Sequence, residues 1–180
     1  MGEKNEKKVI FVTGGCRSGK SQFALDYANR HFSGKTYLAT CEVLDEEMAR
    51  RVENHKMARG PEWKTIEESI RIVERVEEDQ KTDGVILVDC ITLWISCLLM
   101  KWDDDLRILN EVERLLSVLR KGAASLILVS NEVGMGIVPA DGPTRRFRDL
   151  AGAANQKIAG AADTVIFMVS GIPIFLKGVA

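Results

Sequence analysis

Short runs of β-branched and apolar residues alternate along the chain with longer segments that have a helical period. Three of the runs lack the apolar/polar alternation of half-exposed strands, which indicates strands buried on both faces. This pattern predicts an α/β fold in which a mostly parallel sheet carries helices on both faces. The expected strands are residues 9–12, 35–40, 85–88, 125–129 and 164–169, and the expected helices are residues 20–30, 45–56, 69–80, 103–121 and 144–162.

Other sequence signals indicate where the helices begin, where the sheet ends and how many domains the chain forms. Several predicted helices open with Ser, Thr or Asp, which accept hydrogen bonds from the first free N–H groups of a helix. Residues 171–180 are expected to add an edge strand, because Pro173 disfavours a central position. No repeat, low-complexity segment or Pro/Gly/Ser linker interrupts the series, so we expect residues 1–180 to form a single domain.

The charge balance limits the possible partners. Twenty-five Lys and Arg residues face 26 Asp and Glu residues, which leaves a formal net charge of −1. No global basic field therefore exists to hold nucleic acid or an anionic membrane, and any phosphate binding must be local. No stretch approaches the roughly 20 consecutive apolar residues that a membrane span requires.

The cysteines and histidines do not form a metal or disulfide pattern. The four cysteines, Cys16, Cys41, Cys90 and Cys97, contain no C-x-x-C pair, and the chain has only two histidines. Neither a zinc site nor a disulfide framework is indicated. A cytoplasmic location, where thiols stay reduced, fits this usage best.

A glycine-rich segment follows the first expected strand and opens the first expected helix. Gly14-Gly15-Cys16-Arg17-Ser18-Gly19-Lys20-Ser21 matches the P-loop pattern G-x-x-x-x-G-K-[ST]. Its backbone N–H groups would cradle phosphate oxygens, Lys20 would reach the β- and γ-phosphates, and the Ser21 hydroxyl would bind Mg²⁺. The alternative, a simple glycine-rich turn, is disfavoured by the strand-to-helix context.

Asp89 directly follows the apolar run Val85 to Val88. Its carboxylate should lie at the carboxyl edge of a parallel strand, where α/β folds bind ligands, and we expect it to be the second Mg²⁺ anchor. The alternative is that Asp89 caps a helix beginning near Thr92. Asn131 and Glu132 should lie at the same edge, either orienting metal, water or the acceptor hydroxyl, or forming a turn.

His55 shares one face of its expected helix with Arg51 and Arg59, and Lys56 lies beside it. Clustered cations could neutralise a triphosphate and would disfavour the imidazolium, which would leave a neutral, nucleophilic ring near pH 7. The plainer alternative is a solvated surface histidine. His31, at the end of the first expected helix, suits the negative end of the helix dipole.

Several blocks of sequence together resemble one enzyme family. The segments are residues 12–21, residues 44–49 leading to His55-Lys56 and to residues 59–61, residues 63–67, and the block Asn131-Glu-Val-Gly-Met-Gly-Ile-Val-Pro139. On these motifs the chain closely resembles the bifunctional adenosylcobinamide kinase/adenosylcobinamide-phosphate guanylyltransferase family of cobalamin biosynthesis. The resemblance implies a RecA-like P-loop sheet, commonly assembled as a homotrimer with active sites near the subunit contacts.

The resemblance also implies two reactions. In the first, the γ-phosphoryl group of ATP or GTP moves to a hydroxyl of adenosylcobinamide. In the second, a histidine attacks the α-phosphate of GTP, pyrophosphate leaves, and the histidine-GMP passes its nucleotide to adenosylcobinamide phosphate. The matching nucleophile is His55. The matching contacts with nucleotide or its metal are Gly14 to Ser21, Ala39, Thr40, Cys41, Lys56, Met57, Ala58, Arg59, Glu67 and Asp89.

Two positions depart from the family pattern. Some members carry two adjacent histidines where this chain has Asn54-His55, and a small residue is common where it has Cys16. The helix that follows the Asn131 block opens with Arg145, Arg146 and Arg148, either as a solvated face or as part of a corrinoid or subunit interface. Two other functions compete with the bifunctional enzyme: a P-loop kinase without guanylyl transfer, and a non-catalytic RecA-like protein switched by nucleotide.

Overall fold

A computed structural model describes residues 7–41, 59–81 and 84–178. Its centre is a seven-stranded sheet with the strand order β3-β2-β4-β5-β1-β6-β7. Six strands are parallel, and β7 runs antiparallel to β6 at one edge. The strands are β1 (Val9–Gly14), β2 (Lys35–Ala39), β3 (Trp63–Glu67), β4 (Val85–Asp89), β5 (Ser125–Asn131), β6 (Thr164–Val169) and β7 (Ile172–Lys177).

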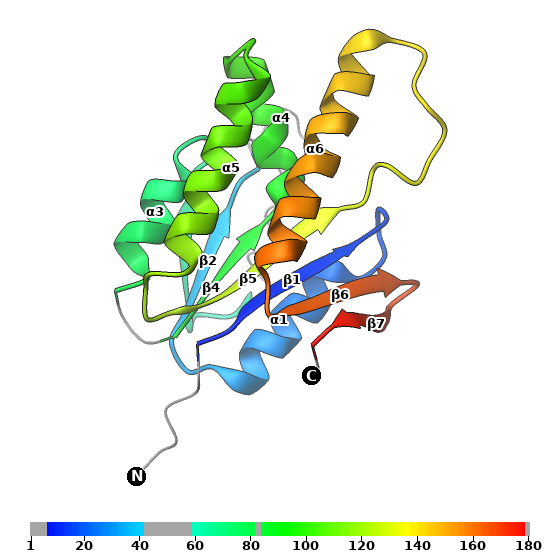
Figure 1. Cartoon of the computed structure of the whole chain (residues 1–180). Helices are drawn as coiled ribbons and strands as arrows, with labels where there is room; N and C mark the ends of the chain where they lie inside the picture. The colour runs from blue at the N-terminus through cyan, green and yellow to red at the C-terminus, as the bar shows by residue number, and fades with distance from the viewer. Residues whose placement is uncertain (1–6, 42–58, 82–83, 179–180) are drawn as a thin grey trace.

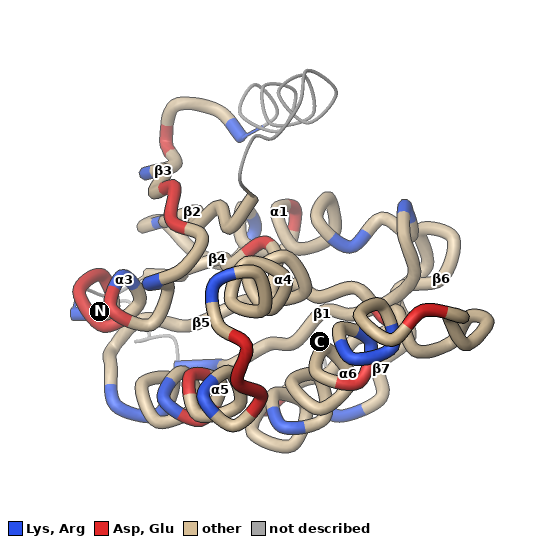
Figure 2. The backbone as a smooth tube through the Cα atoms, turned by 90° about the horizontal axis from the view of Figure 1, so that it is seen from above, with Lys and Arg blue, Asp and Glu red and all other residues tan. Residues whose placement is uncertain are grey.

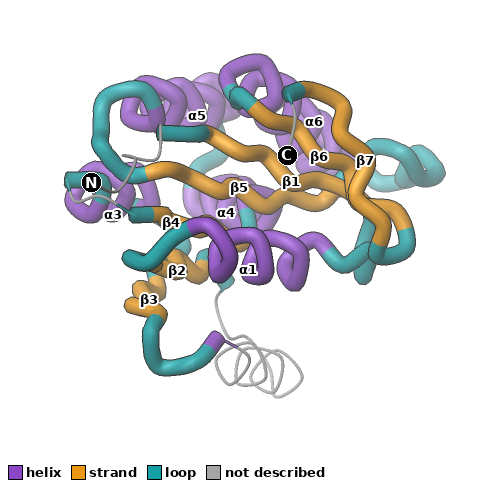
Figure 3. The backbone as a smooth tube through the Cα atoms, turned by 90° about the horizontal axis from the view of Figure 1, so that it is seen from below, coloured by secondary structure: helices purple, strands orange, loops and turns teal. Residues whose placement is uncertain are grey.

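Helices cover both faces of this sheet (Figure 1). Figure 3 shows α1 on one side and α5 and α6 on the other. The helices are α1 (Lys20–His31), α3 (Ile72–Asp79), α4 (Ile91–Lys101), α5 (Asp105–Leu119) and α6 (Gly142–Ala161). The expected α/β fold class is confirmed, including the buried central strands and the C-terminal edge strand.

Two apolar cores lie on the two faces of the sheet because successive side chains of a strand point in opposite directions. On β1, Ile10 and Val12 pack with Leu25 of α1, whereas Phe11 faces the larger helical layer. The larger core takes its helical side chains from α3, α4, α5 and α6. The centres of β1, β4 and β5 are therefore covered on both sides and read as continuous apolar runs.

Two helices begin with acidic N-caps, Asp104 and Asp141, whose positions the sequence signals did not specify. The Asp104 carboxylate accepts the N–H of Arg107 at 3.0 Å at the start of α5, and Asp141 accepts the N–H of Thr144 at 2.8 Å at the start of α6. The N-cap residues of α1, α3 and α4 make no side-chain hydrogen bond to the start of their helices. The acidic caps fix where α5 and α6 begin, at Asp105 and Gly142, each two residues away from the expected start.

Strand β3 is absent from the expected series, and α4 enters it only as the helix beginning near Thr92 in the alternative role of Asp89. Periodicity does not define α4 because it is apolar nearly all round: Ile91, Trp94, Ile95 and Leu98 are all completely buried, so its sequence shows no amphipathic period. Strand β3 was left out because it is a short edge strand whose exposed positions are polar. The expected helix at residues 45–56 lies entirely outside the described residues, and its existence stays a prediction.

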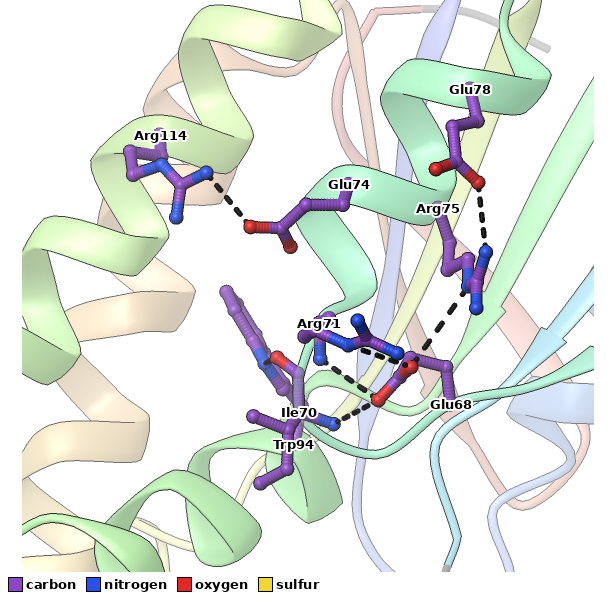
Figure 4. A network of polar contacts seen from close by, with 8 residues as sticks. All are labelled: Glu68, Ile70, Arg71, Glu74, Arg75, Glu78, Trp94 and Arg114. Atoms are coloured by element: carbon purple, nitrogen blue, oxygen red, sulfur yellow. Dashed lines mark hydrogen bonds and ion pairs between the residues drawn. The ribbon is translucent and has the colours of Figure 1, made fainter.

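The junction between β3 and α3 explains why α3 begins later than expected (Figure 4). The Glu68 carboxylate accepts the N–H groups of Ile70 and Arg71, both at 3.0 Å, and so holds this turn in a non-helical shape. The carbonyl of Ile70 accepts the indole N–H of Trp94 at 3.0 Å. Farther along α3, Glu74 accepts a hydrogen bond from Arg114 of α5 at 3.0 Å. These contacts fasten α3 to α4 and α5.

Charged residues of both signs are distributed over the described backbone (Figure 2). Within residues 7–41, 59–81 and 84–178, no helix has the length and apolar character needed to cross a bilayer. All four cysteines lie in the described part of the chain, and none of them forms a disulfide.

Candidate functional site: a P-loop and its neighbouring strand ends

Three expected site residues form one row at the carboxyl edge of the sheet. The register pairs Ala39 with Glu67 on one side and with Asp89 on the other. The ends of β3, β2 and β4 therefore lie next to each other, although Glu67 and Asp89 are 22 residues apart in sequence. Parallel strands place their carboxyl ends at a common edge, which is where ligands bind in open α/β sheets.

The P-loop leaves the same edge at the end of β1. Gly14 has φ +147°, and a Cβ there would collide with the carbonyl oxygen of Met168. Gly19, which precedes the first residue of α1, has φ +93°, a conformation that favours glycine. These two glycines let the chain turn from a buried strand into a helix within five residues, so the loop surrounds the N-terminus of α1.

Neighbouring strands hold the P-loop in place. The N–H of Gly171, in the turn between β6 and β7, donates to the carbonyl of Ser18 at 3.0 Å. On the other side, the N–H of Glu132 donates to the carbonyl of Gly14 at 2.9 Å. The loop is therefore fixed before any ligand binds, with its first residue beside the end of β5.

Lys20 is folded onto the loop and is only 7% exposed. Its Nζ donates to the carbonyl of Gly15 at 2.7 Å. Burial lowers the pKa of Lys20, while Cys90, Asp89 and Cys16 act in the opposite direction through their charges. A desolvated ammonium group at the start of a helix is suited to bind phosphate oxygens, which would replace the water it has lost.

Asp89 is held by a tyrosine from the neighbouring strand. The hydroxyl of Tyr37 donates to Asp89 Oδ2 at 2.9 Å. The alternative role of Asp89 as a helix cap is wrong, because Cys90 occupies the N-cap position of α4 and no side chain caps that helix. The carboxylate stays half-buried at the strand end, where one of its oxygens can face a metal ion.

The same tyrosine supports Arg59. The Arg59 guanidinium lies over the Tyr37 ring, 3.8 Å from its centroid, and the residue is 4% exposed. Trp63 meets the same ring edge-on, with 6.2 Å between centroids. A planar guanidinium stacked on an aromatic face keeps its N–H groups in a fixed plane, which suits recognition of phosphate.

Thr40 and Cys90 connect the ends of β2 and β4. Thr40 Oγ1 donates to the carbonyl of Cys90 and accepts the N–H of Cys90, both at 2.7 Å. The Asp89–Cys90 peptide bond is cis. Because its hydroxyl is engaged in these bonds, the Thr40 side chain has a structural role, and its contact with nucleotide stays a prediction.

The donor set at this edge fits Mg²⁺. Ser21 supplies a hydroxyl at the start of α1, and Asp89 supplies a carboxylate whose charge is close enough to act on Lys20. Mg²⁺ in nucleotide sites is held by one or two such oxygen ligands together with substrate phosphates and water, so a cluster of acidic residues is not required. Consistent with this, the described residues contain no group of three or more His, Cys, Asp and Glu side chains suited to a metal.

Asn131 ends β5 at the expected edge, and Glu132 directly follows it. Glu132 also forms a turn, because its Oε1 accepts the N–H of Gly134 at 2.9 Å. The backbone of Asn131 is held by Thr92, whose hydroxyl accepts the Asn131 N–H at 2.7 Å, and by Asn155, whose side chain donates to the Asn131 carbonyl at 3.1 Å. The turn role is therefore observed, and a role in orienting metal, water or substrate stays a prediction.

The three arginines at the start of α6 make contacts within the chain. Arg145 donates to the carbonyls of Pro139 and Ala140 at 3.0 and 2.6 Å, and Arg148 donates to the carbonyl of Gly134 at 2.7 Å. Arg146 forms ion pairs with Asp103 and Asp105. They are more than a solvated face, and their part in a corrinoid or subunit interface stays untested.

Of the other expected site residues, some lie in the described part of the chain and the rest lie outside it. Gly15, Cys16 and Arg17 lie exposed on the P-loop, and Ser18 is buried within it. Cys41 is half-exposed just beyond β2, and Glu67 is exposed at the end of β3. His55, Lys56, Met57 and Ala58 lie outside the described residues, so their predicted roles stay predictions.

Sequence reasoning missed Tyr37, which was counted only as part of a buried strand. Its distinguishing signal is a phenol two residues before the end of a strand, on the face of the sheet that carries α1. A buried hydroxyl must find a hydrogen-bond partner, and the nearest strand end supplies the carboxylate of Asp89.

Solved structures with similar architecture are P-loop ATPases. The type III secretion ATPase EscN from enteropathogenic E. coli matches with a TM-score of 0.61 at 12% identity, covering 91% of this chain and 43% of that one. The flagellar accessory protein FlaH from Methanocaldococcus jannaschii matches with a TM-score of 0.53 at 15% identity, covering 95% and 78%. Together with the Gly14–Ser21 loop, this likeness defines a RecA-like P-loop fold.

Sequence comparison narrows this class to a family. Residues 10–176 match the model of the CobU family, cobinamide kinase / cobinamide phosphate guanyltransferase. The bifunctional adenosylcobalamin biosynthesis protein CobU of Escherichia coli K12 is 38% identical, covering 94% of this chain and 99% of that protein. The corresponding protein CobP of Pseudomonas aeruginosa is 40% identical, covering 93% and 96%. The chain belongs to this family, whose two activities are cobinamide kinase and cobinamide phosphate guanylyltransferase.

Proposed function

We propose that this protein performs both reactions on one P-loop domain of residues 1–180. It phosphorylates adenosylcobinamide with ATP or GTP and then transfers GMP from GTP to adenosylcobinamide phosphate. The observation that supports this best is the fixed P-loop, with desolvated Lys20 facing the strand end that carries Asp89. In this proposal Lys20 binds the β- and γ-phosphates, and Ser21 and Asp89 hold Mg²⁺, which supplies charge neutralisation at the phosphates.

The guanylyl transfer proceeds in two steps through His55. A ring nitrogen attacks the α-phosphorus of GTP, the bond between the α-phosphorus and its bridging oxygen breaks, and pyrophosphate leaves with that oxygen. A phosphate oxygen of adenosylcobinamide phosphate then attacks the same phosphorus, the P–N bond breaks, and the imidazole is released. Nucleophilic catalysis of this kind replaces one difficult transfer by two in-line displacements. Arg59, stacked on Tyr37, would neutralise nucleotide phosphate charge.

The decisive experiment is labelling with GTP that carries ³²P in the α-phosphate. The wild-type protein should retain acid-labile label, and His55→Ala should lose it. His31→Ala is the matched control, because His31 is the other histidine and lies at the end of α1. If His55→Ala is labelled as strongly as wild type, the assignment of His55 is wrong.

The pH dependence gives a second check on the nucleophile. The attacking imidazole must be neutral, and an unperturbed histidine has a pKa of about 6.5. Label formation should therefore fade below that pH, and a rate that stays flat well into the acidic range would contradict a histidine nucleophile.

A kinase without guanylyl transfer remains the competing function. It predicts release of ADP or GDP when cobinamide is supplied, with no covalent nucleotide under any condition. The two functions are separated by assaying both activities in His55→Ala, which should keep γ-phosphoryl transfer if the protein is bifunctional. Absence of cobinamide binding, followed by the colour of the corrinoid, would support the non-catalytic nucleotide switch instead.

The proposed assembly is a homotrimer in the cytoplasm. Exposed apolar side chains on β7 support an interface between copies at this edge of the sheet, among them Ile172 at 65% and Leu176 at 63% exposure. Free thiols at all four cysteines suit a reducing compartment. Light scattering of the purified protein measures the assembly directly, and a monomer at micromolar concentration would contradict it.

A further inference from the structure

Tyr37 contacts two different parts of the nucleotide site with two different parts of its side chain. Its hydroxyl donates to Asp89, and the face of its ring carries the guanidinium of Arg59. The residue is 4% exposed, and Trp63 packs edge-on against the ring. Tyr37 therefore cannot move without moving both charged groups.

The hydroxyl can serve only as a donor to this carboxylate. Burial, together with the charge and hydrogen bond of Asp89, raises the pKa of Tyr37 well above its ordinary value. The phenol stays protonated at every physiological pH, and its single proton is committed to Asp89 Oδ2. A carboxylate with one oxygen held in this way presents the other oxygen in a fixed direction.

We propose that Tyr37 is a positioning residue that aligns the Asp89 carboxylate for Mg²⁺ and the Arg59 guanidinium for nucleotide phosphate. The hydroxyl performs the first task and the ring performs the second, so the two tasks can be separated by substitution. This inference rests on the proposed role of Asp89 as a metal ligand.

The experiment measures binding of a fluorescent, non-hydrolysable GTP analogue, with Mg²⁺ titrated or removed by EDTA, and so needs no turnover. Tyr37→Phe keeps the ring but loses the hydroxyl; it should need about fivefold to tenfold more Mg²⁺ and bind the analogue normally in EDTA. Tyr37→Leu should also weaken binding in EDTA several-fold, because the Arg59 guanidinium loses its support. Tyr27→Phe, on α1, is the matched control and should change neither quantity.

A double substitution identifies the route by which the hydroxyl acts. If it acts through Asp89, the Mg²⁺ dependence of Tyr37→Phe/Asp89→Asn should equal that of Asp89→Asn alone. Additive effects, or a Tyr37→Phe protein with unchanged or tighter Mg²⁺ dependence, would overturn the inference. An Asp89→Asn protein with normal Mg²⁺ dependence would instead remove the metal role in the proposed function. The Phe substitution preserves ring packing, so it decides the point even if Tyr37→Leu does not fold.

A separate observation concerns residues 133–140, the loop between β5 and α6. Three of its apolar side chains are strongly exposed: Met135 at 76%, Ile137 at 96% and Val138 at 63%. The backbone that carries them is nevertheless fixed at both ends, by Arg148 at Gly134 and by Arg145 at Pro139 and Ala140. An exposed apolar surface on an anchored loop is typical of a binding site.

The position of this loop indicates what it binds. It directly follows Glu132, whose N–H donates to the carbonyl of Gly14 at the entrance of the P-loop. Figure 1 shows the loop extending from the end of β5 beyond the edge of the sheet where the P-loop lies. The acceptor of the phosphoryl group must approach from this edge. Its corrin ring is a large body that carries apolar methyl groups between the amide side chains of its rim, and a flexible arm joins it to the reacting hydroxyl.

The geometry points to Met135, Ile137 and Val138 as the surface that receives the apolar rim of the corrinoid acceptor. This inference deepens the proposed function and depends on it. The double variant Met135→Ser/Ile137→Ser should raise the KM for adenosylcobinamide about fivefold to tenfold and leave the KM for GTP unchanged. Leu106→Ser removes an equally exposed apolar side chain from α5, 76% exposed, and should change neither constant.

Direct binding of cobinamide by equilibrium dialysis separates the possible failures. If wild type binds no cobinamide, the proposed function itself fails. If wild type and the double variant bind it equally, the loop is not the acceptor surface. A variant that keeps both KM values but loses its oligomeric state would show that the loop is a contact between copies, and this would also overturn the inference.

Discussion

The hydroxyl of Thr40 bonds both backbone groups of Cys90, donating to the carbonyl and accepting the N–H at 2.7 Å each. Both residues are almost completely buried, at 0% and 5% exposure. One side chain therefore joins the end of β2 to the start of α4, at the point where Asp89 leaves the sheet. The alignment of the strand ends at the nucleotide site depends on this contact.

Thr40→Val should destabilise the protein by about 2–4 kcal/mol, because it keeps the shape of the side chain but leaves the buried N–H of Cys90 without a partner and the Cys90 carbonyl with only the N–H of Trp94. Urea unfolding measures the change. Thr40→Ser keeps the hydroxyl and should lose about 1 kcal/mol or less. Equal losses in the two variants would show that the methyl group, rather than the hydrogen bonds, carries the effect.

Lys20→Met should reduce kcat/KM for the kinase reaction by at least about 100-fold, because the charge that balances the transferred phosphoryl group is removed. Lys121→Met, at an exposed position after α5, removes the same charge from a site far from the P-loop in the fold and should have wild-type activity. Initial rates with labelled ATP or GTP give both values. A Lys20→Met protein within tenfold of wild type would contradict the assigned role.

Cysteine alkylation should distinguish the exposed P-loop thiol of Cys16 from the buried thiol of Cys90. Cys16 is exposed, whereas burial and the nearby charge of Asp89 raise the pKa of Cys90 to about 12. At pH 8 Cys90 is protonated and enclosed, so iodoacetamide should modify Cys16 first. Saturating Mg²⁺-nucleotide should protect Cys16. Peptide mass spectrometry follows both sites, and labelling of Cys90 as fast as Cys16 in the folded protein would be inconsistent with this geometry.

The cap of α6 should contribute stability only while Asp141 is ionised. Hydrogen bonds from the side chain and backbone N–H of Thr144 lower the pKa of Asp141 below its ordinary value of 3.8. A lowered carboxyl pKa adds stability above 3.8 that is lost as the pH falls through the folded-state value. Asp141→Ala should therefore unfold at lower urea than wild type near pH 7, and the gap should close in stronger acid.

Asp149→Asn, an exposed substitution within α6, is the control for removing one negative charge. Its midpoint should follow that of wild type across the same pH range. A gap between Asp141→Ala and wild type that persists unchanged well below pH 3.8 would mean that the cap does not act through its charge.

The sequence by itself determined the α/β fold class, the P-loop and the place of Asp89. These features depend on residues that are close together in the chain: a buried strand, two glycines in a required conformation, and a helix start. The family motifs also lie in short continuous blocks, so a single sequence is enough to show the resemblance.

Tertiary structure decided what depends on residues far apart in the chain. The sequence pattern could not give the bounds of α4, because burial on all sides removes its period, and it could not find β3, because its pairing with β2 is made across the sheet. It also could not show that Tyr37 joins Asp89 to Arg59, or that Arg145 and Arg148 anchor the loop beside the P-loop. Periodicity reports which face a side chain occupies, whereas the partner it meets there is fixed only when strand order and register bring distant segments together.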